Sequence, residues 1–182
     1  MVSRKADATP VSRARPDSTE YPAWYAGYVA SVPNGDIVAV LREGGNDLAS
    51  ALRAIPESKG EHRYAEGKWT VRTLLGHMID AERIFAYRAL RLARGDATPL
   101  AGFEENDYAR AAGSDARTVV DIASEMFVVR EGTVRLFESL PNDAWARSGT
   151  VNNGQVTVRA LAYIIAGHVT HHLGVLRDRY GL

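Results

Sequence analysis

The stretch 156–180 constrains the fold more than any other part of the sequence. Its apolar residues follow helical spacing, with Leu161, Ile165, Val169 and Leu176 along one stripe. Recurrence every three to four residues is the period of an amphipathic helix that buries one face. The stretch therefore predicts a helix that packs against other elements along this stripe.

The same stretch carries three of the five histidines of the chain. At about 100° per residue, His168 and His172 project from one side of the helix about 40° apart, whereas His171 points about 60° to the other side of His168. Two imidazoles one turn apart can chelate one ion. Because no Glu follows His168, the pair does not form the HExxH signature of metalloproteases.

Three earlier stretches also show helical spacing of apolar residues, and each is bounded by capping or breaking residues. The third follows alternating spacings of three and four, as in the seam of a helical bundle. The first predicted helix runs from a cap at Asn34 or Asp36 to about Ala54, and the second from a cap at Thr70 to Gly95. The third runs from about Asp115 to Leu140. Thr157 caps the terminal helix.

Four long helices without a convincing strand pattern predict an all-α fold, a four-helix bundle. The short first connection makes the first two helices antiparallel, and the long crossover 95–115 between helices 2 and 3 permits a parallel pair. The predicted order is therefore up-down-down-up. We expect a short helix near 104–111, an aromatic arm without regular structure at 21–32, and a loop at 141–155.

Helix depth adds a third histidine to the pair on the terminal helix. His77 lies about 10 Å beyond the start of the second helix, and His172 lies about 12 Å before the end of the fourth. Antiparallel packing of these two helices would bring His77, His168 and His172 level. Three neutral imidazoles suit zinc first, with nickel or iron(II) as alternatives, and leave positions open for water or substrate. Alternatively, these histidines are hydrogen-bonded core residues.

Several other polar residues are weaker candidates. Asp80, Glu82 and Asp178 are possible hydrogen-bond partners for the imidazoles, which metal-binding histidines usually need, or else charges on helix surfaces. In a hydrolase, Glu82, Asp80 or Glu104 would have to act as the catalytic base. Arg88 is a candidate contact for an anionic substrate, or part of a solvated basic face. We expect that His171 does not bind the ion directly.

Composition narrows the function classes further. The 22 basic residues balance the 22 acidic ones, which does not suggest a nucleic-acid or membrane-surface protein. The chain has no cysteine, so disulfides, thiolate ligands and a protein thiol nucleophile are excluded. Residues 1–20 are polar and lack the apolar core of a secretory signal, so we expect a flexible tail, a cytoplasmic location and one domain at 21–182.

Three segments resemble the DinB-like superfamily, which includes YfiT-like and bacillithiol-transferase-like proteins. They read, in the order found in that family, GKWTVRTLLGHMIDAERIFAYRALRLARGD, TPLAGFEENDY and VTVRALAYIIAGHVTHHLGVLRDRYG. The resemblance spans about 21–181. It implies a four-helix bundle, a divalent metal held by His77, His168 and His172, and a homodimer.

The resemblance leaves the reaction open. It implies first a metal-dependent thiol S-transferase that takes a low-molecular-weight thiol as co-substrate, with a role in stress or detoxification. The alternatives are a metal-dependent hydrolase that activates water, and a non-catalytic metal-binding stress protein. In each enzymatic case we expect a small-molecule substrate, with neither nucleic acid nor membrane as a partner.

Overall fold

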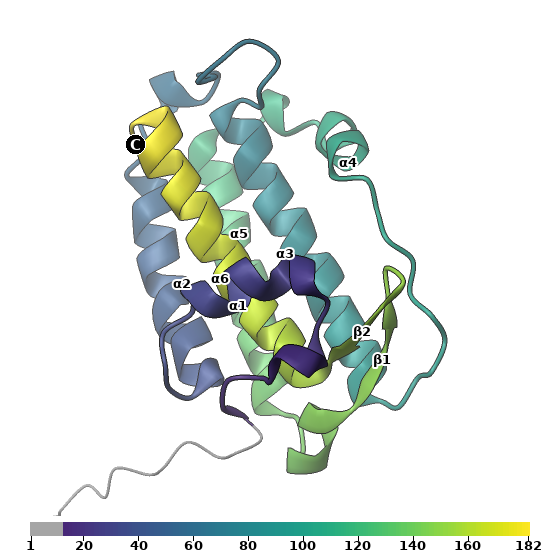
Figure 1. Cartoon of the computed structure of the whole chain (residues 1–182). Coiled ribbons are helices and arrows are strands. Elements are labelled where there is room, and N and C mark those ends of the chain that lie inside the picture. Colours follow the sequence, from purple (N-terminus) through teal and green to yellow (C-terminus); the bar gives the residue numbers. More distant parts are fainter. Residues whose placement is uncertain (1–12) are drawn as a thin grey trace, which may run out of the picture.

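The computed structural model describes residues 13–182 and shows a four-helix bundle (Figure 1). Two long helices run in one direction and two in the other, in the order up-down-down-up, as the connection lengths predict. Among the described residues, no helix is both long enough and apolar enough to span a membrane. The four bundle helices are α2 (Ile37–Arg53), α3 (Val71–Ala93), α5 (Val119–Glu138) and α6 (Val158–Val175).

Each of the four bundle helices begins with a side-chain cap. The capping oxygen accepts a hydrogen bond from a free backbone N–H of the first turn. The predicted caps Asp36, Thr70 and Thr157 are confirmed. The third long helix begins at a cap on Thr118 rather than near Asp115, because the residues just before it form a 3-10 turn (Ser114–Ala116).

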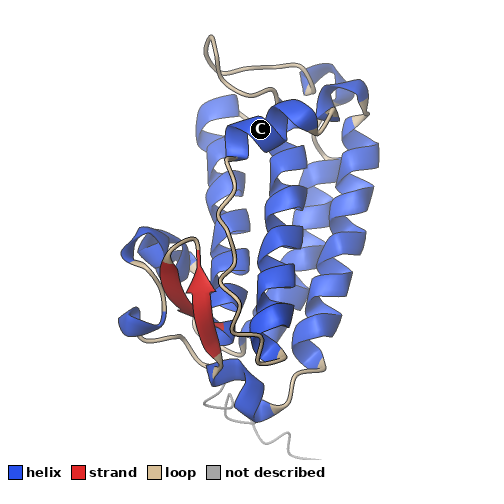
Figure 2. Cartoon of the chain, turned by 90° about the vertical axis from the view of Figure 1, so that its right-hand side faces the viewer, coloured by secondary structure: helices blue, strands red, loops and turns tan. Residues whose placement is uncertain are grey.

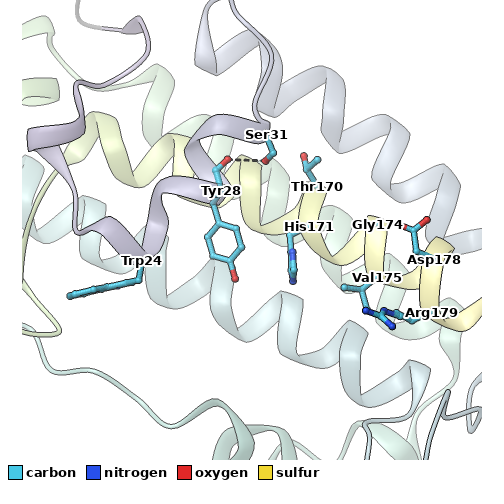
Figure 3. Close-up of a pocket in the computed structure, with 10 residues that line it drawn as sticks. Trp24, Tyr28, Ser31, Thr170, His171, Gly174, Val175, Asp178 and Arg179 are labelled. Atoms are coloured by element: carbon cyan, nitrogen blue, oxygen red, sulfur yellow. Dashed lines mark hydrogen bonds between the residues drawn. The ribbon is translucent and has the colours of Figure 1, made fainter.

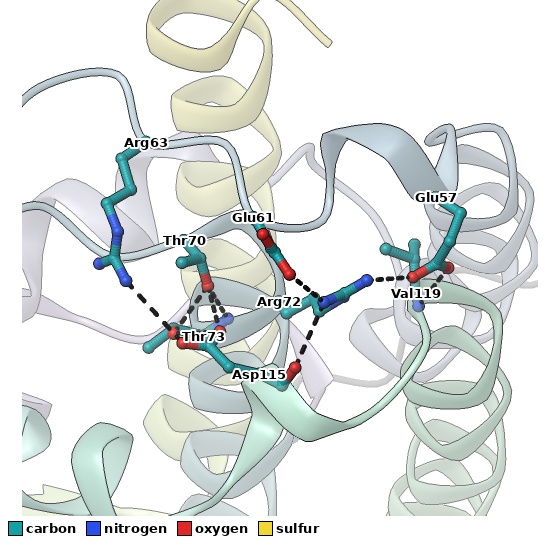
Figure 4. Close-up of polar contacts among 8 residues, drawn as sticks. All are labelled: Glu57, Glu61, Arg63, Thr70, Arg72, Thr73, Asp115 and Val119. Atoms are coloured by element: carbon teal, nitrogen blue, oxygen red, sulfur yellow. Dashed lines mark hydrogen bonds and ion pairs between the residues drawn. The ribbon is translucent and has the colours of Figure 1, made fainter.

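The carboxylate of Asp115 is engaged elsewhere, at the start of α3 (Figure 4). It accepts hydrogen bonds from the hydroxyls of Thr70 at 2.5 Å and Thr73 at 3.0 Å. Arg72 adds a second tie, since it bonds to the carbonyl of Asp115 at 3.2 Å and to Glu57 at 2.5 Å. These contacts hold the N-terminal turn of α3 against the segment that leads into α5.

The crossover between α3 and α5 runs the length of the bundle and contains the short helix α4 (Glu105–Ala111), as expected (Figure 2). Backbone hydrogen bonds attach the crossover to the segment 148–157 near its start, at Leu100. The N–H of Leu100 donates to the carbonyl of Thr150, and the N–H of Asn152 donates to the carbonyl of Leu100, both at 2.9 Å.

A β-hairpin precedes α6 where only a loop was predicted. It consists of β1 (Ser148–Val151) and β2 (Gly154–Thr157), paired antiparallel. Asn152 and Asn153 form the turn with φ values of 48° and 62°, a conformation that Asn tolerates better than most residues. The strands have four residues each, which is too short for alternation to stand out.

The aromatic segment before α2 was expected to lack regular structure, and this is wrong. It forms a 3-10 turn (Ala23–Tyr25) followed by helix α1 (Ala26–Ser31), which crosses α6 (Figure 1). Part of the expected tail, residues 1–12, lies outside the described residues. Residues 13–20 pack on the bundle, where Glu20 accepts a hydrogen bond from Thr157 at 2.9 Å.

Candidate metal centre

The structure brings His77, His168 and His172 together between α3 and α6. The Nε2 atom of His168 lies 3.2 Å from that of His77 and 3.0 Å from that of His172. One ligand atom from each residue falls within 4.8 Å of the other two. Antiparallel packing of α3 and α6 therefore levels the three side chains, as the helix depths predict.

All three imidazoles are buried, with 4% of His77, 5% of His168 and 8% of His172 exposed. Burial lowers the pKa of His77 to about 4 and that of His172 to about 3. Burial, with the neighbouring histidines, also holds the pKa of His168 well below its ordinary value. The rings are therefore neutral at pH 7, and each keeps a nitrogen lone pair that can bind an ion.

Hydrogen bonds alone satisfy this cluster poorly. A neutral imidazole nitrogen carries either one proton or one lone pair, whereas Nε2 of His168 has two close nitrogen neighbours. A single ion between the rings would satisfy all three lone pairs at once. Ligand nitrogens about 2.05 Å from a tetrahedral zinc ion stand about 3.4 Å apart, close to the observed separations. The residues present therefore fit a divalent ion.

The predicted carboxylate partners of these imidazoles are not found. Among the described residues, Asp80, Glu82 and Asp178 make no hydrogen bond to a ring nitrogen of the cluster, and the buried Nδ1 of His172 has no partner. Asp178 pairs instead with Arg177 at 2.7 Å, on the surface.

Glu82 belongs to a buried ion pair in the bundle core. Its two carboxylate oxygens accept bonds of 2.7 Å and 2.6 Å from the guanidinium of Arg130, and both side chains are 2% exposed or less. This bidentate pair joins α3 to α5 and engages both oxygens of Glu82. The proposal that Glu82 acts as a base remains a prediction, and the ion pair lends it no support.

The side chain of Arg88 packs against aromatic rings and is separated from the histidine cluster by one of them, Phe85. Its guanidinium stacks 5.7 Å from the ring of Phe85 and 5.8 Å from that of Phe103, and it donates to the carbonyl of Ala101 at 2.8 Å. The Phe85 ring in turn lies 5.9 Å from the ring of His168. The proposed contact between Arg88 and an anionic substrate remains a prediction.

Aromatic rings surround the three histidines, and sequence reasoning missed their role. The ring of Trp69, the residue before the cap of α3, lies 4.8 Å from the ring of His77. The ring of Tyr28 lies 5.5 Å from that of His168. Tyr28 belongs to the segment 21–32 that was expected to be an arm without regular structure, and no spacing rule relates that segment to the histidines.

Two clefts near the cluster have one lining residue in common, Val175. The first, of about 290 Å³, is lined by His172 and by three polar residues of flanking segments, Lys68, Glu105 and Asn106. The second, of about 590 Å³, lies between α1 and α6 (Figure 3). His171 lines this second cleft from an exposed position. This position agrees with the expectation that His171 does not bind the ion directly.

Two curated relatives are similar to the chain over most of its length. A provisionally named metal-dependent hydrolase of Oceanobacillus iheyensis is 25% identical over 135 residues, which is 72% of this chain and 76% of the relative. A second provisionally named metal-dependent hydrolase, of Bacillus mycoides, is 25% identical over 168 residues, which is 87% of this chain and 95% of the relative.

Two solved structures share the fold. YfiT from Bacillus subtilis, described as a probable metal-dependent hydrolase with an unusual four-helix bundle topology, superposes with a TM-score of 0.70 at 18% identity, over 80% of this chain and 86% of YfiT. A mycothiol-dependent maleylpyruvate isomerase superposes with a TM-score of 0.63 at 16% identity, over 75% of this chain and 58% of the isomerase.

The family follows from the sequence. The sequence model of the DinB superfamily matches residues 41–176, which is well over half of the chain. The matched region includes the three clustered histidines and nearly all of the four bundle helices. The chain therefore belongs to the DinB superfamily.

Proposed function

We propose that His77, His168 and His172 bind one divalent ion, with zinc preferred over nickel or iron(II), and that the chain is a metal-dependent enzyme. The observation that carries this proposal is the convergence of three neutral, buried Nε2 atoms next to a cleft lined by His172. The provisional names of the curated relatives, both metal-dependent hydrolases, support metal dependence.

Our first proposal for the reaction is the transfer of a low-molecular-weight thiol to an electrophilic small molecule, in stress or detoxification. The chain has no cysteine, so the thiol must come from outside. A bound ion would lower the pKa of such a thiol from its usual value of about 8.5 and so supply a thiolate at neutral pH. A structural neighbour that depends on mycothiol supports this reading.

In this proposal the three imidazoles hold the ion, and the clefts admit and orient the two substrates. The aromatic rings of Trp69 and Phe85 lie against the rings of His77 and His168. Lys68 and Asn106 offer polar contacts at the entrance of the cleft that His172 lines. These contacts suit a polar thiol better than an apolar one.

A second candidate function is hydrolysis, and a specific observation favours it. Glu105 lines the same cleft as His172, so a carboxylate faces the space where a substrate would sit. A carboxylate in that position can accept the proton of a water molecule that attacks the substrate. The names of the curated relatives point the same way.

We also keep three narrower proposals. The third candidate function is a non-catalytic metal-binding stress protein, in which the ion only stabilises the bundle. A homodimer and a cytoplasmic location are proposals that size-exclusion chromatography and cell fractionation would check. The zero net charge offers no support for a nucleic-acid partner.

The metal proposal is tested by metal content. The protein is loaded with zinc and dialysed, and the ion is counted by mass spectrometry. We expect about one zinc per chain, which His77→Asn and His168→Asn abolish. His62→Asn is the matched control, because His62 lies outside the cluster, against the ring of Tyr180 at 6.0 Å. Equal zinc in all variants would refute the assignment.

The reaction is tested on the same samples. The zinc- or nickel-loaded protein is incubated with bacillithiol, mycothiol or glutathione and a haloaromatic or epoxide acceptor, and in parallel with ester and amide substrates and no thiol. Thiol-dependent turnover supports the transferase, and thiol-independent turnover supports the hydrolase. If neither occurs and a chelator lowers only the melting temperature, the non-catalytic proposal stands.

A further inference from the structure

We propose that the phenol of Tyr28 contacts the substrate beside the three histidines and donates a hydrogen bond to the substrate atom that carries negative charge. This inference rests on the proposed function, because it needs a substrate at the cluster. Tyr28 belongs to α1, outside both the four bundle helices and the region 41–176 that the family model matches. It would therefore add a group that the shared motif does not contain.

The ring of Tyr28 lies at the edge of the cluster. Its centroid is 5.5 Å from the ring centroid of His168, with the two planes at 88°, and 5.5 Å from that of His171. Figure 3 shows the ring extending from α1 next to His171, with its hydroxyl at the end remote from the α1 backbone. The hydroxyl is thus directed away from α1, within the cleft that Tyr28 and His171 line.

The backbone of α1 is held in place from two sides. A Cβ atom on Gly167 would lie 2.1 Å from the carbonyl oxygen of Tyr28, so α1 rests directly on α6. On the other side, the guanidinium of Arg15 donates to the carbonyls of Val29 and Val32. Because the backbone is fixed, the position of the phenol is largely set before any ligand binds.

The hydroxyl of Tyr28 is free to bind a ligand. Among residues 13–182 no group hydrogen-bonds with it, although the backbone carbonyl of Tyr28 accepts from Ser31 Oγ at 2.8 Å. The hydroxyl of Tyr180, by contrast, donates to the carbonyl of Trp69 at 2.8 Å. A half-buried phenol usually finds a partner, so Tyr28 is left with water or a ligand.

The phenol of Tyr28 can act as a hydrogen-bond donor. A tyrosine phenol, with an ordinary pKa of about 10, is protonated at neutral pH and can donate its O–H. Glu105 lines the cleft of His172, and Val175 lines both that cleft and the cleft of Tyr28. A donor held beside a substrate stabilises negative charge that develops on it.

The test compares Tyr28→Phe, which removes only the hydroxyl, with the control Tyr87→Phe. Tyr87 is exposed on α3, and its hydroxyl binds Arg91. Both variants and the unmodified protein are loaded with zinc, their zinc content is measured, and 2-mercaptoethanol and acetohydroxamic acid are titrated by calorimetry. We expect equal zinc in all three and an affinity for at least one probe that is roughly tenfold lower in Tyr28→Phe alone.

A second readout is independent of affinity. In protein labelled with ¹³Cζ-tyrosine, the resonance that Tyr28→Phe removes should shift when the probe is added to the zinc-loaded protein. Equal probe affinity in the two variants, or an unmoved resonance, would overturn the role of Tyr28 and leave the metal site intact. Loss of zinc in Tyr28→Phe would also overturn it, because the residue would then support the cluster itself. If the unmodified protein binds no zinc, the proposed function fails first.

Discussion

The carbonyl oxygen of Tyr28 lies 2.1 Å from the point where a Cβ atom of Gly167 would stand, so the two backbones touch. A side chain at Gly167 cannot be accommodated by turning a neighbouring side chain, since the obstacle is backbone. We therefore predict that Gly167→Ala lifts α1 from α6 and lowers the free energy of unfolding by about 1–3 kcal/mol, measured in urea. Displacement of Tyr28 should also weaken its ring contact with His168, and NMR ring-current shifts at His168 would report this change.

Gly27→Ala is the matched control for this prediction. Gly27 lies in α1 one residue before Tyr28, and a Cβ atom there would meet nothing within 4 Å. Because Ala favours a helix over Gly, this variant should be neutral or more stable by up to about 1 kcal/mol. Equal effects at the two positions would contradict the close packing of α1 on α6.

The fold was predictable where local chemistry decides it. The helical periods and the caps Asp36, Thr70 and Thr157 lie within each helix, so the bundle and its boundaries could be read from the sequence. The start of α5 could not, because Asp115 bonds to the hydroxyl of Thr70, 45 positions away. Helix α1 has six residues and depends on packing against α6, which no local pattern records.

The candidate site divides in the same way. The pair His168 and His172 follows from helical spacing, and His77 follows from depth once α3 and α6 are taken as antiparallel. The aromatic neighbours Tyr28 and Trp69 depend on tertiary contacts, as does the ion pair that engages Glu82. Its partner Arg130 is 48 positions away, on a different helix.

The ion pair of Glu82 and Arg130 supplies the second prediction. Arg130→Met would leave the Glu82 carboxylate buried without a partner, so we expect a loss of about 3–5 kcal/mol in the free energy of unfolding. The double variant Glu82→Leu with Arg130→Met should recover most of this loss, because an apolar pair can replace a buried ion pair. Chemical denaturation of the three proteins measures both effects.

Arg135→Met is the control for the ion pair. Arg135 bonds to Glu138 at 3.1 Å, but its side chain is 77% exposed. An exposed pair contributes about 0–1 kcal/mol, so this variant should unfold close to the unmodified protein. If Arg130→Met were equally mild, the Glu82 carboxylate would have to find water or another donor in the core.

The third prediction concerns pH and the metal-free protein. The pKa values of His77 and His172 are about 4 and 3 in the folded state, below the value of about 6.5 in an unfolded chain. Between these pKa values the unfolded state binds more protons than the folded state. The free energy of unfolding is therefore highest above about pH 6.5 and falls as pH decreases below that value. The free energy of unfolding in the presence of EDTA should therefore drop steadily from pH 7 to pH 5.

Substitution of one histidine isolates this effect from the carboxylates, which titrate mainly below pH 5. His172→Asn should reduce the slope of unfolding free energy against pH by close to one proton between pH 6 and pH 5. His62→Asn serves as the comparison at a histidine outside the cluster. Identical slopes for His172→Asn and the unmodified protein would mean that His172 is not held neutral by the fold.

The fourth prediction tests what Arg88 does. Its one hydrogen bond to a backbone group joins α3 to the carbonyl of Ala101 in the crossover, and its guanidinium stacks on Phe103 in the same segment. Arg88→Met should remove this tie and speed amide hydrogen exchange in residues 96–104, with a stability loss of about 1–3 kcal/mol. Arg94→Met, at the exposed residue that follows the last residue of α3, should leave the exchange unchanged. A substrate contact would give a different result: Arg88→Lys would raise KM for anionic substrates only, and exchange in the crossover would stay as in the unmodified protein.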